Sequence, residues 1–85
     1  MEQFQGKLMR EGQLVVDNIT GRLTVDFDPN RQQRWSGFFT VPAGTAVQIN
    51  DRFELVLSDG RSSKIHLERV NATSQGIFAS FATEL

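Results

Sequence analysis

The chain has 85 residues, 39% of them hydrophobic and 22% charged, and its formal net charge is −1 at pH 7. This length suits one compact domain, expected to span residues 1–85, and the composition excludes both a disordered chain and a general nucleic-acid binder with a strongly basic face. The chain contains no cysteine, which excludes disulfides and thiolate chemistry, so stability must come from packing or from association between subunits.

The N-terminal segment, residues 1–12, is polar and reads MEQFQGKLMREG. It lacks an apolar run of signal-peptide length, and no stretch of the chain approaches the ~20 apolar residues of a membrane span. We therefore expect a cytoplasmic protein with no membrane partner.

Turn-forming residues recur along the chain at intervals typical of short strands. They cluster at 10–12, 17–21, 28–34, 42–46, 50–51, 58–61 and 71–76. Between the clusters apolar and polar residues alternate, as in 23–27, 35–41, 53–58 and 77–82, and no window keeps the apolar spacing of a helix. The sequence therefore predicts an all-β fold, either a small single-domain barrel or a curved two-layer antiparallel sheet of about seven or eight short strands.

The apolar members of these alternating stretches define the predicted core. Because side chains of a strand point to its two faces in turn, the residues between them are expected to meet solvent. The predicted core contains Leu14, Val16, Leu23, Val25, Phe27, Trp35, Phe39, Val41, Phe53, Leu55, Leu57, Ile65, Leu67, Ile77 and Phe81.

Residues 26–30, DFDPN, begin with the D-x-D-x-N spacing of a calcium-binding loop. Such a loop needs Gly at its sixth position and Glu at its twelfth, where this chain has Arg31 and Gly37. The sequence also lacks the His and Cys cluster of a transition-metal site. We therefore expect no metal site and no cofactor, and we interpret residues 26–30 as a strand end followed by a turn.

Residues 30–39, NRQQRWSGFF, bring positive charge and aromatic side chains together. Arg31, Arg34, Trp35 and Phe38 are suited to stack on bases and neutralise phosphates of single-stranded nucleic acid, or to hold a nucleotide. Trp35 also alternates in phase with the predicted core, and this favours burial over ligand contact. A ligand on these four residues would be expected to quench the fluorescence of Trp35.

Residues 57–66, LSDGRSSKIH, contain an Asp-Gly turn between two alternating strands. Two registers keep the apolar side chains on one face. One pairs Ser58 with Ser62, and the other uses a type I turn with its glycine in the left-handed position and pairs Leu57 with Arg61. The side-chain pairs favour the first register and the turn chemistry favours the second.

His66 lies on the outward face of this hairpin in both registers. Histidine is the residue type most often recruited for acid–base catalysis at neutral pH. Here Lys64 and Glu68 share its solvent-exposed face, and neither Ser62 nor Ser63 belongs to a nucleophile motif. We therefore predict no catalytic residues.

Three large apolar residues, Phe38, Val56 and Phe78, each lie on the face opposite the apolar set of their own strand. On adjacent strands they would form an outer patch suited to a protein partner or a second copy of the chain. Alternatively, the N-terminal residues Phe4, Leu8 and Met9 fold over this patch and bury it.

Together these patterns predict a non-enzymatic interaction or assembly module. We expect it to self-associate, or to bind a protein partner, through its apolar outer face. The alternative is a weak binder of single-stranded nucleic acid or a nucleotide through the Arg31, Trp35 and Phe38 region, and nucleic acid is the less favoured partner.

Overall fold

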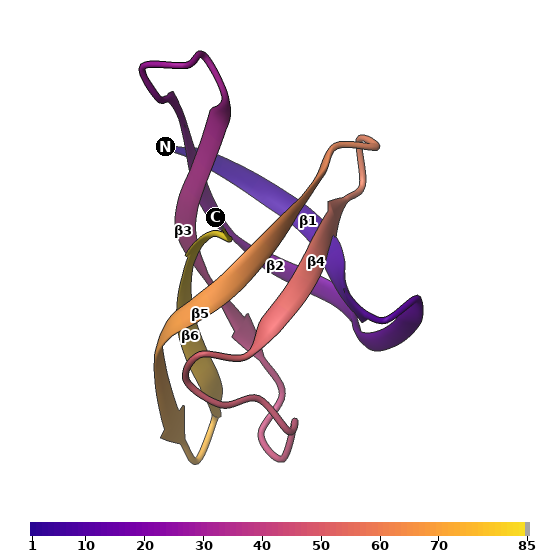
Figure 1. The fold of residues 1–85 in the computed structure, drawn as a ribbon. Coiled ribbons are helices and arrows are strands. Elements are labelled where there is room, and N and C mark those ends of the chain that lie inside the picture. Colours follow the sequence, from indigo (N-terminus) through magenta and orange to yellow (C-terminus); the bar gives the residue numbers. More distant parts are fainter. Residues whose placement is uncertain (85) are drawn as a thin grey trace.

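Figure 1 shows the computed structural model, which describes residues 1–84 as a closed antiparallel barrel of six strands. The strands are β1 (Glu2–Arg10), β2 (Gln13–Phe27), β3 (Gln33–Val41), β4 (Arg52–Leu57), β5 (Ser62–Thr73) and β6 (Gly76–Thr83). Their order around the barrel is β1-β2-β3-β6-β5-β4, and β4 pairs with β1 to close the ring. The predicted small all-β barrel is confirmed, with fewer and longer strands than expected.

β2 is one long strand where the sequence pattern predicted shorter ones. The turn expected at 17–21 is absent, because Asp17 and Asn18 both lie opposite a single residue of β1 and the strand bulges there without ending. Asn18 adopts a positive φ of 54° at this point. A second shift follows in the same pairing, and each shift reverses which side chains face inward. Ile19 is consequently buried, whereas Leu14, expected in the core, is 54% exposed.

The hairpin of β2 and β3 projects beyond one end of the barrel (Figure 1). Phe27 is the last residue of β2, pairs with Gln33 and is 65% exposed, because the strands that would cover it from across the barrel do not reach this far. Val25, two residues earlier, is only half-buried. Both residues were predicted in the core, and for Phe27 that prediction was wrong.

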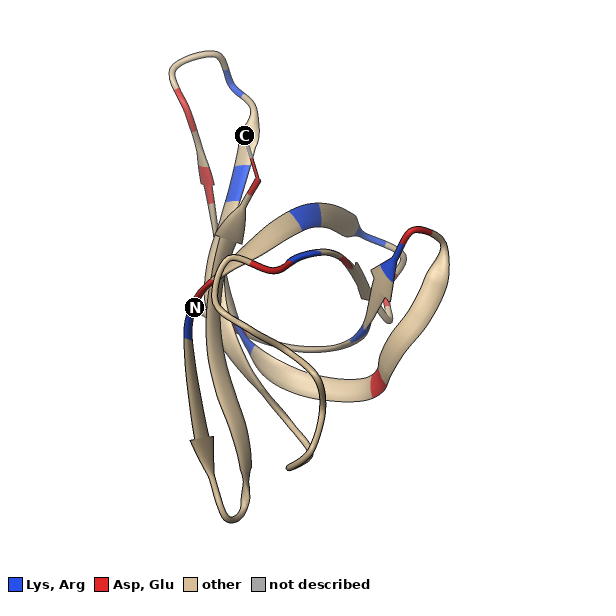
Figure 2. Ribbon diagram, turned by 60° about the horizontal axis from the view of Figure 1, so that its bottom comes forward, with Lys and Arg blue, Asp and Glu red and all other residues tan. Residues whose placement is uncertain are grey.

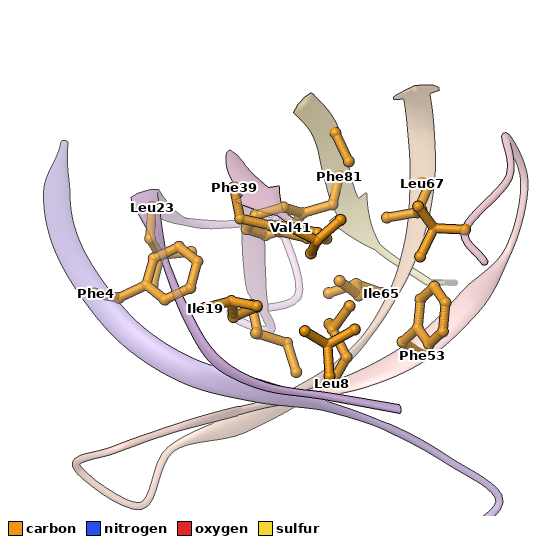
Figure 3. Close-up of a cluster of buried hydrophobic side chains, with 14 of the residues drawn as sticks. Phe4, Leu8, Ile19, Leu23, Phe39, Val41, Phe53, Ile65, Leu67 and Phe81 are labelled. Carbon is orange, nitrogen blue, oxygen red and sulfur yellow. The ribbon is translucent and has the colours of Figure 1, made fainter. Parts of the chain in front are cut away.

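The core fills the barrel with apolar side chains from all six strands (Figure 3). Apart from Leu14, Val25 and Phe27, every residue of the predicted core is buried, including Trp35. Five buried hydrophobic residues were not predicted, namely Phe4, Leu8, Ile19, Val47 and Ala79. β1 is therefore a full member of the barrel wall, and its Phe4 and Leu8 point inward.

Two glycines allow β2 and β3 to approach closely where the wall bends. A Cβ atom on Gly37 would lie 2.0 Å from the carbonyl oxygen of Arg22, and one on Gly21 would lie 2.1 Å from that of Phe38. The ring of Phe4, which pairs with Gly21 across the strands, covers the inner side of this glycine. An aromatic residue opposite a strand glycine restores the packing that the missing side chain would have supplied.

The β4–β5 hairpin adopts the second of the two predicted registers. Phe53 pairs with Ile65, the amide of Leu57 donates to the carbonyl of Arg61 at 2.8 Å, and Gly60 has a φ of 96°. The turn chemistry therefore decided the register. Residues 57–66 therefore contain the turn that joins β4 to β5.

Residues 42–51 cross one end of the barrel, because β3 and β4 are not neighbours. Val47 of this loop is 7% exposed and joins the core. The amide of Asn50 donates to the carbonyl of Leu67 at 2.8 Å, and the amide of Leu67 donates to the carbonyl of Asp51 at 2.9 Å. The loop thus closes this end of the barrel with an apolar side chain and is fastened to β5.

Candidate functional site

Phe38 on β3 and Phe78 on β6 form an aromatic pair on the outside of the barrel. Their strands are neighbours, with Thr40 opposite Phe78 and Ser80 opposite Phe38, so the two rings meet diagonally. The ring centroids are 5.3 Å apart and the planes are tilted by 32°. Phe78 is 40% exposed and Phe38 is half-buried, so an apolar surface faces solvent here.

Val56, the third residue of the predicted patch, lies elsewhere. It is on β4, between Lys7 of β1 and Ser62 of β5, and β5 separates its strand from β6. The N-terminal segment does not cover the aromatic pair either, because β1 stands between β2 and β4 with Phe4 and Leu8 inside the barrel. The structure therefore joins two of the three residues and leaves them uncovered by β1.

Two arginines flank the ring pair. Reading across four adjacent strands, Arg22 of β2 is opposite Phe38 of β3, which is opposite Ser80 of β6, which is opposite Arg69 of β5. The next row pairs Thr20, Thr40, Phe78 and Asn71 in the same order. We call the outward side chains of these two rows the aromatic face: Thr20, Arg22, Phe38, Thr40, Arg69, Asn71, Phe78 and Ser80.

A hollow adjoins the aromatic face on the side of β1. Its lining includes Arg22, Phe38 and the polar side chains of Gln3, Gln5 and Thr20. It therefore offers one cation, aromatic side chains and several neutral hydrogen-bonding groups in one place. Such a combination suits a ligand that carries both negative charge and hydrogen-bonding groups.

The arginines of the aromatic face differ from most others in the chain. Arg10, Arg34, Arg52 and Arg61 each form an ion pair with a carboxylate. Within residues 1–84, neither arginine of the aromatic face has such a pair, and both are exposed. Around the rest of the molecule basic and acidic positions are interspersed (Figure 2), so the aromatic face is a local basic patch and not part of a large positive field.

The site predicted on residues 31–38 is not assembled. Arg34 donates to a carboxylate oxygen of Asp28 at 2.8 Å, so its charge is already compensated. Trp35 is 2% exposed and faces inward, while Phe38 faces outward through the same strand. Arg31 lies in the β2–β3 loop with a φ of 63°. Trp35 is thus a core residue, and its fluorescence reports folding rather than ligand contact.

The carboxylate of Asp28 organises that loop through hydrogen bonds. One oxygen accepts the amides of Asn30 and Gln32, both at 2.9 Å, and the other accepts the guanidinium of Arg34. These hydrogen bonds lower the pKa of the Asp28 carboxyl, and the backbone bond from Gln32 is the largest cause. Asp28 therefore serves the turn that follows the end of β2, in agreement with the interpretation of residues 26–30 as a strand end and a turn.

His66 is placed as a structural surface residue. Its Nδ1 lies 3.1 Å from a carboxylate oxygen of Glu84 without the angle of a hydrogen bond, and its Nε2 lies 3.7 Å from Glu68. Ser63 pairs with Leu55 on the inward side of the sheet, opposite to His66. Ser62 is four residues away along β5, a distance of about 13 Å. Neither serine therefore lies beside the imidazole of His66.

Arg22 and Arg69 were not among the site residues predicted from the sequence. The alternation of residues 23–27 already placed Arg22 on the outward side, but it did not identify β3 as the neighbouring strand. Arg69 was hidden by a bulge: Leu67 faces inward opposite Phe81, and strict alternation would have turned Arg69 inward too, yet the register shifts at Glu68. No local sequence signal marks that shift.

Comparisons with models of protein families, with curated proteins and with solved structures found no match to this chain. Residues 1–84 contain no helix of the length and apolarity that a membrane crossing requires. The site must therefore be interpreted from its own geometry and chemistry.

Proposed function

We propose that the protein is a non-enzymatic binding module that holds an anionic partner on its aromatic face. The observation that carries this proposal is the pair of exposed arginines, Arg22 and Arg69, which flank an exposed aromatic pair without carboxylate partners among residues 1–84. An exposed apolar patch on a small protein marks an interaction site, and uncompensated cations at its rim select partners of negative charge.

The chemistry of the aromatic face favours binding over catalysis. Its members are two arginines, two phenylalanines, three hydroxyl residues and one amide. His66 is not a member, because it pairs with Arg52 and Ala82 and so lies outside both rows of the aromatic face. Arginine stays protonated in water and does not act as a general base at neutral pH. The face therefore offers positive charge, stacking surface and hydrogen bonds, and none of its side chains is an evident proton acceptor.

The test compares two double variants that change the net charge equally. In one, Arg22→Gln and Arg69→Gln remove the cations of the aromatic face; in the other, Arg31→Gln and Lys64→Gln remove two cations elsewhere that also have no ion pair within residues 1–84. Binding of heparin at low salt is measured by calorimetry or on an affinity column. We expect the first variant to lose most of its affinity and the second to keep it. Equal losses in both variants, or no binding by the parent protein, would contradict the proposal.

Self-association through the aromatic face is the second candidate. The specific observation in its favour is the exposed ring pair, with Phe78 at 40% exposure. It ranks second because a two-fold interface between copies brings the same patch together, arginines included, and like charges across an interface are unfavourable. A stable dimer also needs about 800 Å² of contact from each partner.

The mass in solution, measured by light scattering after gel filtration, decides this candidate. A dimer that becomes a folded monomer on Phe78→Asp would support self-association through the aromatic face. A parent protein that is monomeric at high and low salt would exclude it at the concentrations measured.

A further inference from the structure

We infer that the anionic partner is single-stranded nucleic acid, whose bases stack on Phe38 and Phe78 while its phosphates meet Arg22 and Arg69. This inference rests on the proposed function and names its ligand class. It depends on the combination of rings and cations, since a base-free polyanion would use only the cations.

The two aromatic rings supply the stacking surface for the bases. The ring centroids of Phe38 and Phe78 are 5.3 Å apart, and the two ring planes are tilted by 32°. Both project from neighbouring strands of one sheet, and Phe78 is 40% exposed. Exposed aromatic side chains on a barrel surface are platforms for unpaired bases, and stacking of this kind tolerates any base because every base has a π-face.

The two arginines supply the positive charge for the phosphates. Arg22 and Arg69 stand at the two ends of one row, with Phe38 and Ser80 between them. Adjacent strands are about 4.8 Å apart, so three steps place the two arginine backbones about 14 Å apart, on either side of the rings. A strand that lies across the rings along this row passes both guanidinium groups.

Neutral polar side chains lie between and beside the rings and the arginines. Thr20, Thr40 and Asn71 complete the second row, and the hollow beside Phe38 adds Gln3 and Gln5. These neutral side chains donate and accept hydrogen bonds without repelling phosphate. The aromatic face itself contains no carboxylate.

The same features disfavour duplexes as the partner. Bases inside a duplex are stacked on one another and do not present their faces to protein side chains. With a net charge of −1, the protein as a whole exerts little long-range attraction on a polyanion. We therefore expect a modest affinity for single-stranded nucleic acid, an electrostatic attraction that acts only over short distances, and a marked dependence of binding on salt.

The experiment measures fluorescence anisotropy of a labelled ten-nucleotide oligothymidylate at low salt. Its matched probe is a strand of the same length and label in which the bases are replaced by abasic sites, so that the phosphates stay and the stacking surface is removed. The parent protein is expected to bind the oligothymidylate at least fivefold more tightly than the abasic strand, because stacking is worth about 1–3 kcal/mol per base.

The protein variants separate ring from charge. Phe38→Leu with Phe78→Leu keeps apolar bulk and removes the π-faces, and Phe27→Leu is the control because Phe27 is exposed at 65% on the projecting hairpin. We expect the double variant to lose roughly fivefold or more in affinity for the oligothymidylate and to bind heparin unchanged. The control should match the parent, and circular dichroism confirms that each variant is folded.

Each outcome decides something. Equal binding of the two strands, with no effect of the double leucine variant, would overturn the inference and leave the anionic-partner proposal standing. A parent protein that binds neither heparin nor either of the two strands would overturn both the inference and the anionic-partner proposal. A parent protein that binds neither strand, and forms a dimer that Phe78→Asp converts to a folded monomer, would assign the aromatic face to self-association instead.

Discussion

At the scale of single residues, Gly37 shows how tightly the barrel wall is packed. A Cβ atom here would lie 2.0 Å from the carbonyl oxygen of Arg22, and the clashing atom belongs to the backbone of the neighbouring strand. Gly37→Ala must therefore push β2 and β3 apart, and we expect it to lower the free energy of unfolding by about 1–3 kcal/mol. Denaturant titration measures the loss, with the exposed Ser36→Ala as control. An alanine variant as stable as the parent would contradict the close approach.

The sequence identified individual core residues well where alternation is undisturbed. Trp35 and Phe39 were assigned inward and Phe38 outward from alternation alone, and the structure agrees. Alternation failed for Leu14 and Phe27. Leu14 is separated from the regular part of β2 by two register shifts, and Phe27 lies beyond the end of the barrel; the local pattern indicates neither the shifts nor the length of the wall.

At the scale of elements, three charged side chains fasten the β4–β5 turn to the start of β1. Both terminal nitrogens of Arg61 donate to the carboxylate of Glu2 at 3.1 Å, and its Nε donates to Asp59 at 2.9 Å. The side-chain bond from Arg61 lowers the pKa of Glu2. The backbone amide of Arg61, followed by its side chain, lowers that of Asp59.

This cluster predicts a dependence of stability on pH. Because the folded pKa values of Glu2 and Asp59 lie below their ordinary values of 4.5 and 3.8, the ionised carboxylates favour the folded state above that range. The contribution fades as the pH falls through the lowered folded values. We expect the difference in melting temperature between the parent and Arg61→Gln to shrink from about pH 5 to about pH 3, and to shrink at high salt. A constant difference across that range would exclude the cluster as its cause.

The register of the same hairpin could be narrowed to two possibilities from the sequence but not decided by side-chain pairing. The structure selects the register in which Leu57 hydrogen-bonds to Arg61 and Gly60 takes a positive φ. The backbone preference of one glycine outweighed the pairing of two apolar side chains. Where turn chemistry and side-chain pairs disagree in a short hairpin, the turn has the better claim.

At the scale of the whole molecule, β1 closes the barrel between β2 and β4. Leu8 lies at this closure, opposite Val16 on one side and Leu55 on the other, and is fully buried. Leu8→Ala leaves a cavity that two strands line, and we expect a loss of about 2–5 kcal/mol in the free energy of unfolding. Met9→Ala, on the outward neighbour, should cost much less. Similar effects of the two substitutions would show that the closure contributes little.

The arrangement of strands around the barrel is what the sequence could not supply. Alternation says which side a residue faces but not which strand lies next to it. The pairing of β3 with β6 brought Phe38 beside Phe78, and the place of β4 across the barrel removed Val56 from the patch. Only a contact between segments far apart in the chain defines the aromatic face, so no local pattern announces it.

The bulge at Glu68 has a consequence for how this surface can change. Because it shifts the register between Leu67 and Arg69, everything beyond it on β5 is displayed in opposite phase, with Arg69 outside and Val70 against the core. Deletion of Glu68 would remove the bulge and place Arg69 directly after Leu67, where strict alternation turns it outward, so the residues as far as the turn would keep the sides they face now. Loss of a paired residue between Arg69 and the turn would instead reverse the inward and outward side chains beyond it, so the extra residue is the one position of this stretch that can be lost without disturbing the aromatic face.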